Sequence, residues 1–367
     1  MRTLRTILIG QFVLGVMLAA TAPGAQQAAD MPRVENAKLE TRSVTGSLDA
    51  TFRELAAKAD KPEWIGFSVD QIPGEHNACC GNYRDDGSCG TCNLENDRDG
   101  GTGTAQKSGA IKLESARQLV VLLRLEAKQV VKIRVASQNC TLDAGGLPFV
   151  WLTDVKSAES VALLETYVRG ASFDGHGDHG LGNGALTAIA LHAEASADHA
   201  LESFVAPDQK EALRRQAAFW MGAARGKAGL NNLLRMAKSD PSSDVRAQVA
   251  FALYVSHEPA AIDAMIRMAH DDASAHVRGQ ALFWLAQRAG QKAVGTITGA
   301  IENDPDTEVK KKAVFALSQL RREEGVPKLI EVAQTNRNPE VRKQAMFWLG
   351  QSHDPRALDF LEKVLTQ

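Results

Sequence analysis

The sequence predicts an α+β N-terminal domain followed by an α-solenoid of helix pairs with a repeat of about 32 residues, so that the chain is predominantly α. In the C-terminal half, phenylalanine recurs at a fixed spacing of 32 residues, at Phe219, Phe251, Phe283, Phe315 and Phe347. Before residue 170, short apolar runs alternate with polar residues, which is typical of strands. Between the two parts, residues 170–184 contain six glycines. We therefore expect a cysteine-containing domain at 47–169, a Gly-rich linker at 170–184 and a solenoid at 185–367.

One 32-residue unit shows why the repeat is a helix pair. Val245, Val249 and Leu253 are spaced to form one apolar stripe on a helix. Glu258-Pro259 interrupts the pattern, and a second stripe follows in residues 262–269. Helices of about 12 residues are too short to be stable alone, so neighbouring units must stack.

Segments such as DPSSDVRAQVAFAL and NRNPEVRKQAMFWLG resemble HEAT repeats of the short bacterial kind that is also found in phycobilin lyases. The resemblance covers residues 208–367, with a degraded unit at 186–206. It implies a ladder between neighbouring units, formed by the Asp before the second helix of a pair and the Arg at that helix's start. The matching pairs are Asp240 with Arg246, Asp272 with Arg278, Asp304 with Lys310, and Asn336 with Arg342. Lys310 and Asn336 depart from the pattern, because Lys lacks the planar fork of Arg and Asn lacks a charge.

Tryptophan alternates with alanine directly after the phenylalanines. Trp220, Trp284 and Trp348 follow the first, third and fifth, whereas Ala252 and Ala316 follow the other two. Packing of a large side chain against a small one in adjacent units explains this alternation. An aromatic strip that binds a ligand is the alternative. Since the phenylalanines lie nearer the edge of the apolar stripe, we expect them to be partly exposed and to form the candidate partner surface.

The N-terminus has the features of a signal peptide. Arg2 and Arg5 precede an apolar run over residues 7–20, and small residues follow. We expect residues 1–25 to be removed, residues 26–46 to be a flexible lead-in, and the mature protein to be periplasmic or secreted, with no membrane span. An uncleaved anchor is the alternative. Within 47–169 the patterns predict a helix at 47–60, a strand at 64–72, a hairpin at 119–135, a strand at 149–152 and a helix at 157–168.

All five cysteines precede the repeats, which in an exported protein predicts a disulfide framework. Our preferred pairing joins Cys79 and Cys80 with Cys92 and Cys140 and leaves Cys89 as a free thiol, although spacing alone does not determine connectivity. A zinc site formed by these cysteines, with or without His76, is one alternative. Thiol–disulfide exchange by Cys89 and Cys92 is another, and it would require that pair at a helix start.

Histidines offer two weaker signals. His176, Asp178 and His179 are metal-ligand types, but the surrounding glycines favour a linker. His192, His257 and His353 recur near helix ends, where a cation is favoured by the helix dipole.

The net charge of −2 gives no indication of nucleic-acid binding. No phosphate loop, Gly-x-Ser-x-Gly or His-Glu-x-x-His occurs in the sequence. We therefore expect no catalytic, cofactor or metal residues, and we interpret the chain as an exported, non-catalytic scaffold or adaptor that binds a protein partner. The alternatives are the thiol or metal functions above and, as a weaker one, a lyase-like enzyme.

Overall fold

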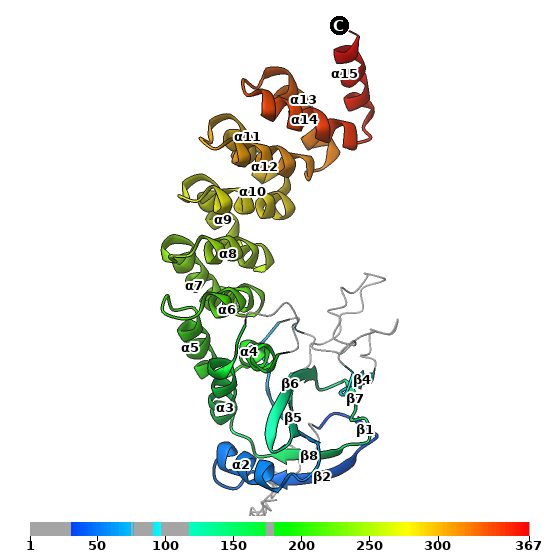
Figure 1. Ribbon diagram of the computed structural model, residues 1–367, viewed down its shortest axis with the longest axis vertical. Helices are drawn as coiled ribbons and strands as arrows, with labels where there is room; N and C mark the ends of the chain where they lie inside the picture. Colours follow the sequence, from blue (N-terminus) through cyan, green and yellow to red (C-terminus); the bar gives the residue numbers. More distant parts are fainter. Residues whose placement is uncertain (1–30, 75, 77–90, 97–116, 174–179, 367) are drawn as a thin grey trace, which may run out of the picture.

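The computed structural model describes residues 31–74, 76, 91–96, 117–173 and 180–366, and it places a sheet domain at one end of a long array of helices (Figure 1). The predicted signal peptide, Cys79, Cys80, Cys89 and the histidine pair at 176 and 179 lie outside the described residues.

A five-stranded mixed sheet forms the N-terminal domain, with strand order β2-β8-β3-β5-β6. Its strands are β2 (Lys38–Ser43), β3 (Glu63–Asp70), β5 (Gln118–Glu126), β6 (Gln129–Ser137) and β8 (Pro148–Thr153). β2, β8 and β3 are parallel, whereas β3, β5 and β6 are antiparallel. The β5–β6 hairpin turns at Ala127 and Lys128, both with positive φ, as a tight hairpin turn of the primed type requires.

A second, smaller sheet covers one face of the first. It has the order β1-β7-β4, formed by β1 (Val34–Glu35), β7 (Thr141–Asp143) and β4 (Thr91–Asn93). Trp64, Phe149 and Trp151 are buried between the two sheets. The opposite face of the large sheet packs into a second and larger core. Because β5 is buried on both faces, its sequence is an almost unbroken apolar run.

Helices cover the other face of the large sheet. They are α2 (Leu48–Lys58), α3 (Ser157–Gly170) and α4 (Leu181–Leu191). Ser47 caps α2, since its hydroxyl accepts a hydrogen bond from the main chain of Ala50 at 3.2 Å.

The prediction of a flexible lead-in at 26–46 is wrong over residues 34–43. These residues form β1 and β2, and β2 pairs in parallel with β8 over its whole length. Five of the six β2 residues are exposed, so this edge strand is held mainly by main-chain hydrogen bonds. A strand with that pattern has no apolar alternation for the sequence to reveal.

The predicted linker at 170–184 is also too long. α3 extends to Gly170, and α4 already begins at Leu181. Gly182 and Gly184 belong to α4 and not to a flexible segment. A Cβ atom at Gly184 would lie 2.1 Å from the main-chain oxygen of Ile133 in β6, so glycine allows the helix to approach the sheet closely.

The array consists of helices stacked in two rows. The even row contains α6 (Glu211–Ala224), α8 (Ser243–Val255), α10 (Ala275–Ala289), α12 (Thr307–Ser318) and α14 (Pro339–Gln351). The odd row contains α7 (Gly226–Ser239), α9 (Ala261–Asp271), α11 (Val294–Asn303), α13 (Arg322–Thr335) and α15 (Pro355–Leu365). α5 (Ala195–Phe204) completes the first pair with α4, and the short 3₁₀ turn η2 (Gly290–Ala293) precedes α11. Each even-row helix contacts the next one in that row.

One continuous hydrophobic core joins the sheet to the array. It extends from Leu48 in α2, through Ile133 in β6 and Leu186 in α4, to Phe360 in α15. The sheet domain and the solenoid therefore share one hydrophobic core. Within the described residues, no helix combines the length and the apolar character that crossing a membrane requires.

Candidate functional site

Aromatic side chains from the even-row helices form a continuous surface, which we call the aromatic strip. Its members are Phe219, Trp220, Phe251, Tyr254, Phe283, Trp284, Phe315, Phe347 and Trp348. All are half-buried except Phe347, whose relative exposure is 54%. Each phenylalanine lies outside the buried stripe of its helix, near its edge, and the fixed repeat aligns these positions along the even row.

The phenylalanines stack in pairs. The rings of Phe219 and Phe251 lie 5.8 Å apart with an interplanar angle of 15°. Phe283 and Phe315 repeat this arrangement at 5.7 Å and 6°. Offset stacking of this kind is one of the favoured arrangements of aromatic rings.

The tryptophans connect one stack with the next. The ring of Trp284 lies 4.7 Å from those of both Phe251 and Phe283, and 4.8 Å from that of Tyr254. Trp348 likewise lies 4.9 Å from Phe315 and 5.0 Å from Phe347. At the other end Trp220 meets Phe219 at 5.2 Å. Ring contacts therefore continue from α6 to α14.

The two interpretations of the tryptophans turn out to be compatible. Trp220, Trp284 and Trp348 pack against the core, as the packing interpretation requires. They are nevertheless only half-buried, and they share one surface with the phenylalanines. Trp220 is thus only partly buried.

The ion-pair ladder differs from its predicted pairing. The guanidinium of Arg214 donates two hydrogen bonds to the carboxylate of Asp240, at 2.9 and 3.0 Å, and this pair is buried. Arg246 with Asp272 and Arg278 with Asp304 repeat that geometry, always 26 residues apart. The prediction that Asp240 pairs with Arg246 is therefore wrong for the side chains. Arg246 instead donates to the main-chain oxygen of Asp240 at 2.8 Å.

The same 26-residue spacing places the two residues that depart from the Arg–Asp pattern in one rung of the ladder. Lys310 and Asn336 would form the fourth rung of this ladder, but Lys310 donates to the main-chain oxygen of Glu302 at 2.8 Å. Arg342 donates to the main-chain oxygen of Asn336 at 2.8 Å. The planar side-chain pair of the other rungs is replaced at this rung by separate main-chain contacts.

The described cysteines lie in the core between the two sheets. Cys92 is in β4, and Cys140 directly precedes β7. Burial raises the pKa of Cys140 to about 11. A catalytic thiol needs an exposed position and a lowered pKa, and Cys92 lies in a buried strand and not at a helix start. Cys92 is disulfide-bonded, whereas Cys140 carries a thiol, so the predicted pairing is wrong for Cys140 and stays a prediction for Cys79 and Cys80.

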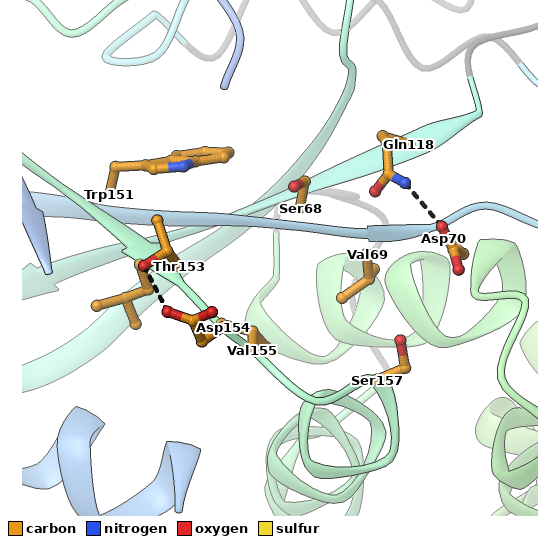
Figure 2. A pocket seen from close by; sticks show the side chains of 10 residues that line it. Ser68, Val69, Asp70, Gln118, Trp151, Thr153, Asp154, Val155 and Ser157 are labelled. Carbon is orange, nitrogen blue, oxygen red and sulfur yellow. Dashed lines mark hydrogen bonds between the residues drawn. The ribbon is translucent and has the colours of Figure 1, made fainter. Parts of the chain in front are cut away.

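A small polar pocket lies where the parallel strands of the large sheet end (Figure 2). Asp70 at the end of β3 accepts a hydrogen bond from the Gln118 amide at 2.7 Å. Asp154 accepts from the hydroxyls of Thr153 and Ser43, at 3.0 and 2.6 Å. No histidine, lysine or cysteine is found among the described residues that line this pocket. No group of described residues could hold a metal ion either.

Sequence reasoning missed a row of polar side chains beside the aromatic strip. Gln216, Gln248, Gln280 and Gln344 each lie three residues before a phenylalanine of the strip. They recur at the 32-residue spacing, so the signal that reveals the phenylalanines could also have revealed them. Because residues three apart are neighbours on a helix, these amides border the strip.

The profile of the HEAT-repeat family matches residues 199–286 and 296–367. Residues 199–367 are HEAT repeats. The HEAT array thus includes both helix rows and begins in α5, before the first phenylalanine of the strip. A search of curated protein sequences returns no match.

Solved structures similar to the chain include human deoxyhypusine hydroxylase in complex with glycerol, at 15% identity over 56% of this chain and 90% of that one, with a TM-score of 0.30. The CpcE–CpcF complex of phycocyanin lyase from Nostoc sp. PCC7120 matches at 20% identity over 42% of this chain and 99% of that one, with a TM-score of 0.34. The Cnd3–Cnd2 condensin subcomplex of S. pombe matches at 20% identity over 56% and 28%, with a TM-score of 0.36.

Proposed function

We propose that this protein is an exported, non-catalytic scaffold whose HEAT array binds a protein partner through the aromatic strip. The observation that carries the proposal is the unbroken series of ring contacts along one row of helices, from Trp220 to Phe347. Aromatic side chains are enriched at protein interfaces, because they bury a large area and lose little conformational entropy. A surface that spans five repeats suits an extended partner better than a small metabolite.

This proposal is best tested in the intact chain. Removal of residues 185–367 would also remove most of α4, which covers β6 and completes the core of the sheet domain. Substitutions on the surface avoid that problem. Phe347 and Leu358 have the same relative exposure of 54%, but Phe347 lies on the strip and Leu358 on α15 of the odd row.

We expect Phe347→Ser, combined with Phe283→Ser, to reduce capture of the partner from the cell envelope by at least about tenfold. Leu358→Ser is the matched control and should capture as much partner as the unsubstituted protein. Quantitative mass spectrometry of the captured proteins provides the measurement, and circular dichroism checks that each variant is folded. If the two variants capture the same partners in the same amounts, the strip is not the binding surface.

Export is supported by the basic start and the apolar run at residues 7–20. Cell fractionation followed by N-terminal sequencing tests it, and the mature chain should begin shortly after residue 24 or 25. Recovery of the chain in the cytoplasm with its first residues intact would contradict export.

A further inference from the structure

The glutamine row supplies the strip with hydrogen-bonding groups that the fold leaves unused. Gln216, Gln248, Gln280 and Gln344 make no side-chain hydrogen bond to any described residue, and none of their amides is buried without a partner. The indole N–H groups of Trp220 and Trp284 likewise donate to no described residue. Each amide has both a donor and an acceptor, so the row offers a polar contact at every repeat except the fourth.

Positive charge accompanies this row. Lys312 takes the glutamine position in the fourth repeat, while Arg215, Lys311 and Lys343 lie four residues before a phenylalanine of the strip. No Asp or Glu lies three or four residues to either side of those phenylalanines. Carboxylates occur only nearer the helix starts, and Glu308 there pairs with Lys311 at 2.9 Å. The centre of the strip therefore favours a partner with negative charge.

The spacing of the repeats selects the conformation of the partner. Packed helices in one row lie about 8–10 Å apart. A polyproline II chain has three residues per turn and rises about 3.1 Å per residue, so one turn spans about 9 Å and matches one repeat. Every third residue of such a chain would face a successive helix of the even row, although the paired phenylalanine rings themselves lie closer together, at 5.8 and 5.7 Å. An extended β-strand alternates with a period of two and would not keep that register.

Hydrogen bonding favours the same conformation. A polyproline II chain makes no internal hydrogen bonds, so its carbonyl oxygens are free to accept from the glutamine amides and from the indoles of Trp220 and Trp284. The main chain of a bound helix is already satisfied and would leave the glutamine row unused. Aromatic rings are also suitable partners for proline side chains.

We infer that the aromatic strip and the glutamine row together bind an acidic, proline-rich segment of a partner protein in the polyproline II conformation. This inference rests on the proposed function and specifies the class of its partner. It assigns the phenylalanines and tryptophans to the prolines, the glutamines to the main-chain carbonyls, and Arg215, Lys311, Lys312 and Lys343 to the acidic side chains.

Synthetic peptides provide the probe. A fluorescent peptide with repeating Glu-Pro-Pro and about twelve residues would span roughly four turns. Its affinity for the full-length mature protein is measured by fluorescence anisotropy. It should bind at least about tenfold more tightly than the Lys-Pro-Pro peptide of equal length. It should also bind more tightly than an acidic amphipathic helical peptide, and raised salt should weaken its binding.

A separate variant tests the contribution of the glutamine row to binding. Gln216→Ala, Gln248→Ala and Gln280→Ala combined should weaken binding of the Glu-Pro-Pro peptide at least about tenfold, since one hydrogen bond typically accounts for about two- to tenfold. Gln334→Ala on α13 of the odd row is the matched control and should leave the affinity unchanged. Circular dichroism verifies that the triple variant is folded.

The outcomes separate this inference from the proposed function. Tight binding of Glu-Pro-Pro that depends on the glutamine row, with displacement of the captured partner, supports the inference. Tighter binding of the helical peptide, or equal affinity in the triple variant, overturns it, and partner capture that still depends on Phe283 and Phe347 then leaves the proposed function intact. Loss of that dependence overturns both.

Discussion

The first three rungs of the ladder share one geometry, and the fourth differs from them in its residues. Arg214, Arg246 and Arg278 each present two N–H groups to a carboxylate, and each also donates to a main-chain oxygen near the preceding turn. Burial raises the pKa of Asp304, but the hydrogen bonds from Arg278 and from the main chain of Asp306 outweigh it, so that pKa lies below its usual value. The rung is therefore charged at neutral pH, and its contribution to stability is lost as the pH falls through that lowered pKa.

We predict that Lys310→Arg and Asn336→Asp together restore the fourth rung. Each single change leaves an unmatched partner and should stabilise the protein little or not at all. The double variant should exceed the sum of the single effects by about 1 kcal/mol, within the usual range for residues in contact. Urea unfolding of the four proteins in a double-mutant cycle measures this coupling. Additive effects would show that the helices cannot bring these side chains together.

The correct rung could not be derived from one unit of sequence. The guanidinium of Arg246 reaches both the main-chain oxygen of Asp240 and the carboxylate of Asp272. The 32-residue pattern contains both pairings, and only the stacking of helices decides between them. The phenylalanines, in contrast, were predicted to be partly exposed because their angular position on one helix determines that property.

At the scale of elements, α4 is the helix that attaches the HEAT array to the sheet. Its glycines made it resemble a linker in the sequence, since glycine disfavours helices by about 1 kcal/mol relative to alanine. Contact with β6 overrides that preference, because any larger residue at position 184 would meet the main chain of Ile133. β2 was missed for a similar reason: its strand pairing depends on β8, more than 100 residues away.

We predict that Gly184→Ala destabilises the protein by about 1–3 kcal/mol, since the added methyl group must displace α4 from β6. Gly295→Ala in α11 is the matched control. A Cβ atom there meets nothing within 4 Å, so this change should stabilise the protein by up to about 1 kcal/mol. Midpoints of urea unfolding measure both effects. A stable Gly184→Ala variant would mean that α4 is not tightly packed on the sheet.

At the scale of the whole molecule, the junction of sheet and array depends on His192. Main-chain hydrogen bonds link residues 70–72 to residues 191–193, and Gln71 forms a bridge with His192. Arg225 of the array donates to the main-chain oxygen of His192 at 2.7 Å. Burial, and after it the charge of Arg225, lowers the pKa of His192 to about 4, although Asp70 acts in the opposite direction. At neutral pH His192 is uncharged, so the expected cationic cap of a helix end does not apply to it.

We predict a pH dependence of stability that originates at this junction. The folded pKa of about 4 lies below the unfolded value of about 6.5, so the unfolded chain binds more protons between those values. The free energy of unfolding should therefore rise with pH from 4 to 6.5, with up to about 3 kcal/mol from this one residue. His192→Gln should flatten the profile, whereas His270→Gln, whose side chain is 83% exposed, should not. Equal profiles for wild type and His192→Gln would contradict this assignment.

Because tryptophan and alanine alternate, the packing of the array repeats every two helix pairs and not every one. Trp284 fills the space beside Phe251 and Tyr254, in the layer whose own residue at this position is Ala252. Excision of residues 243–274 would place two tryptophan-bearing helices side by side, whereas excision of 64 residues would restore the original sequence of layers. The array therefore keeps its packing only when it gains or loses two helix pairs at a time.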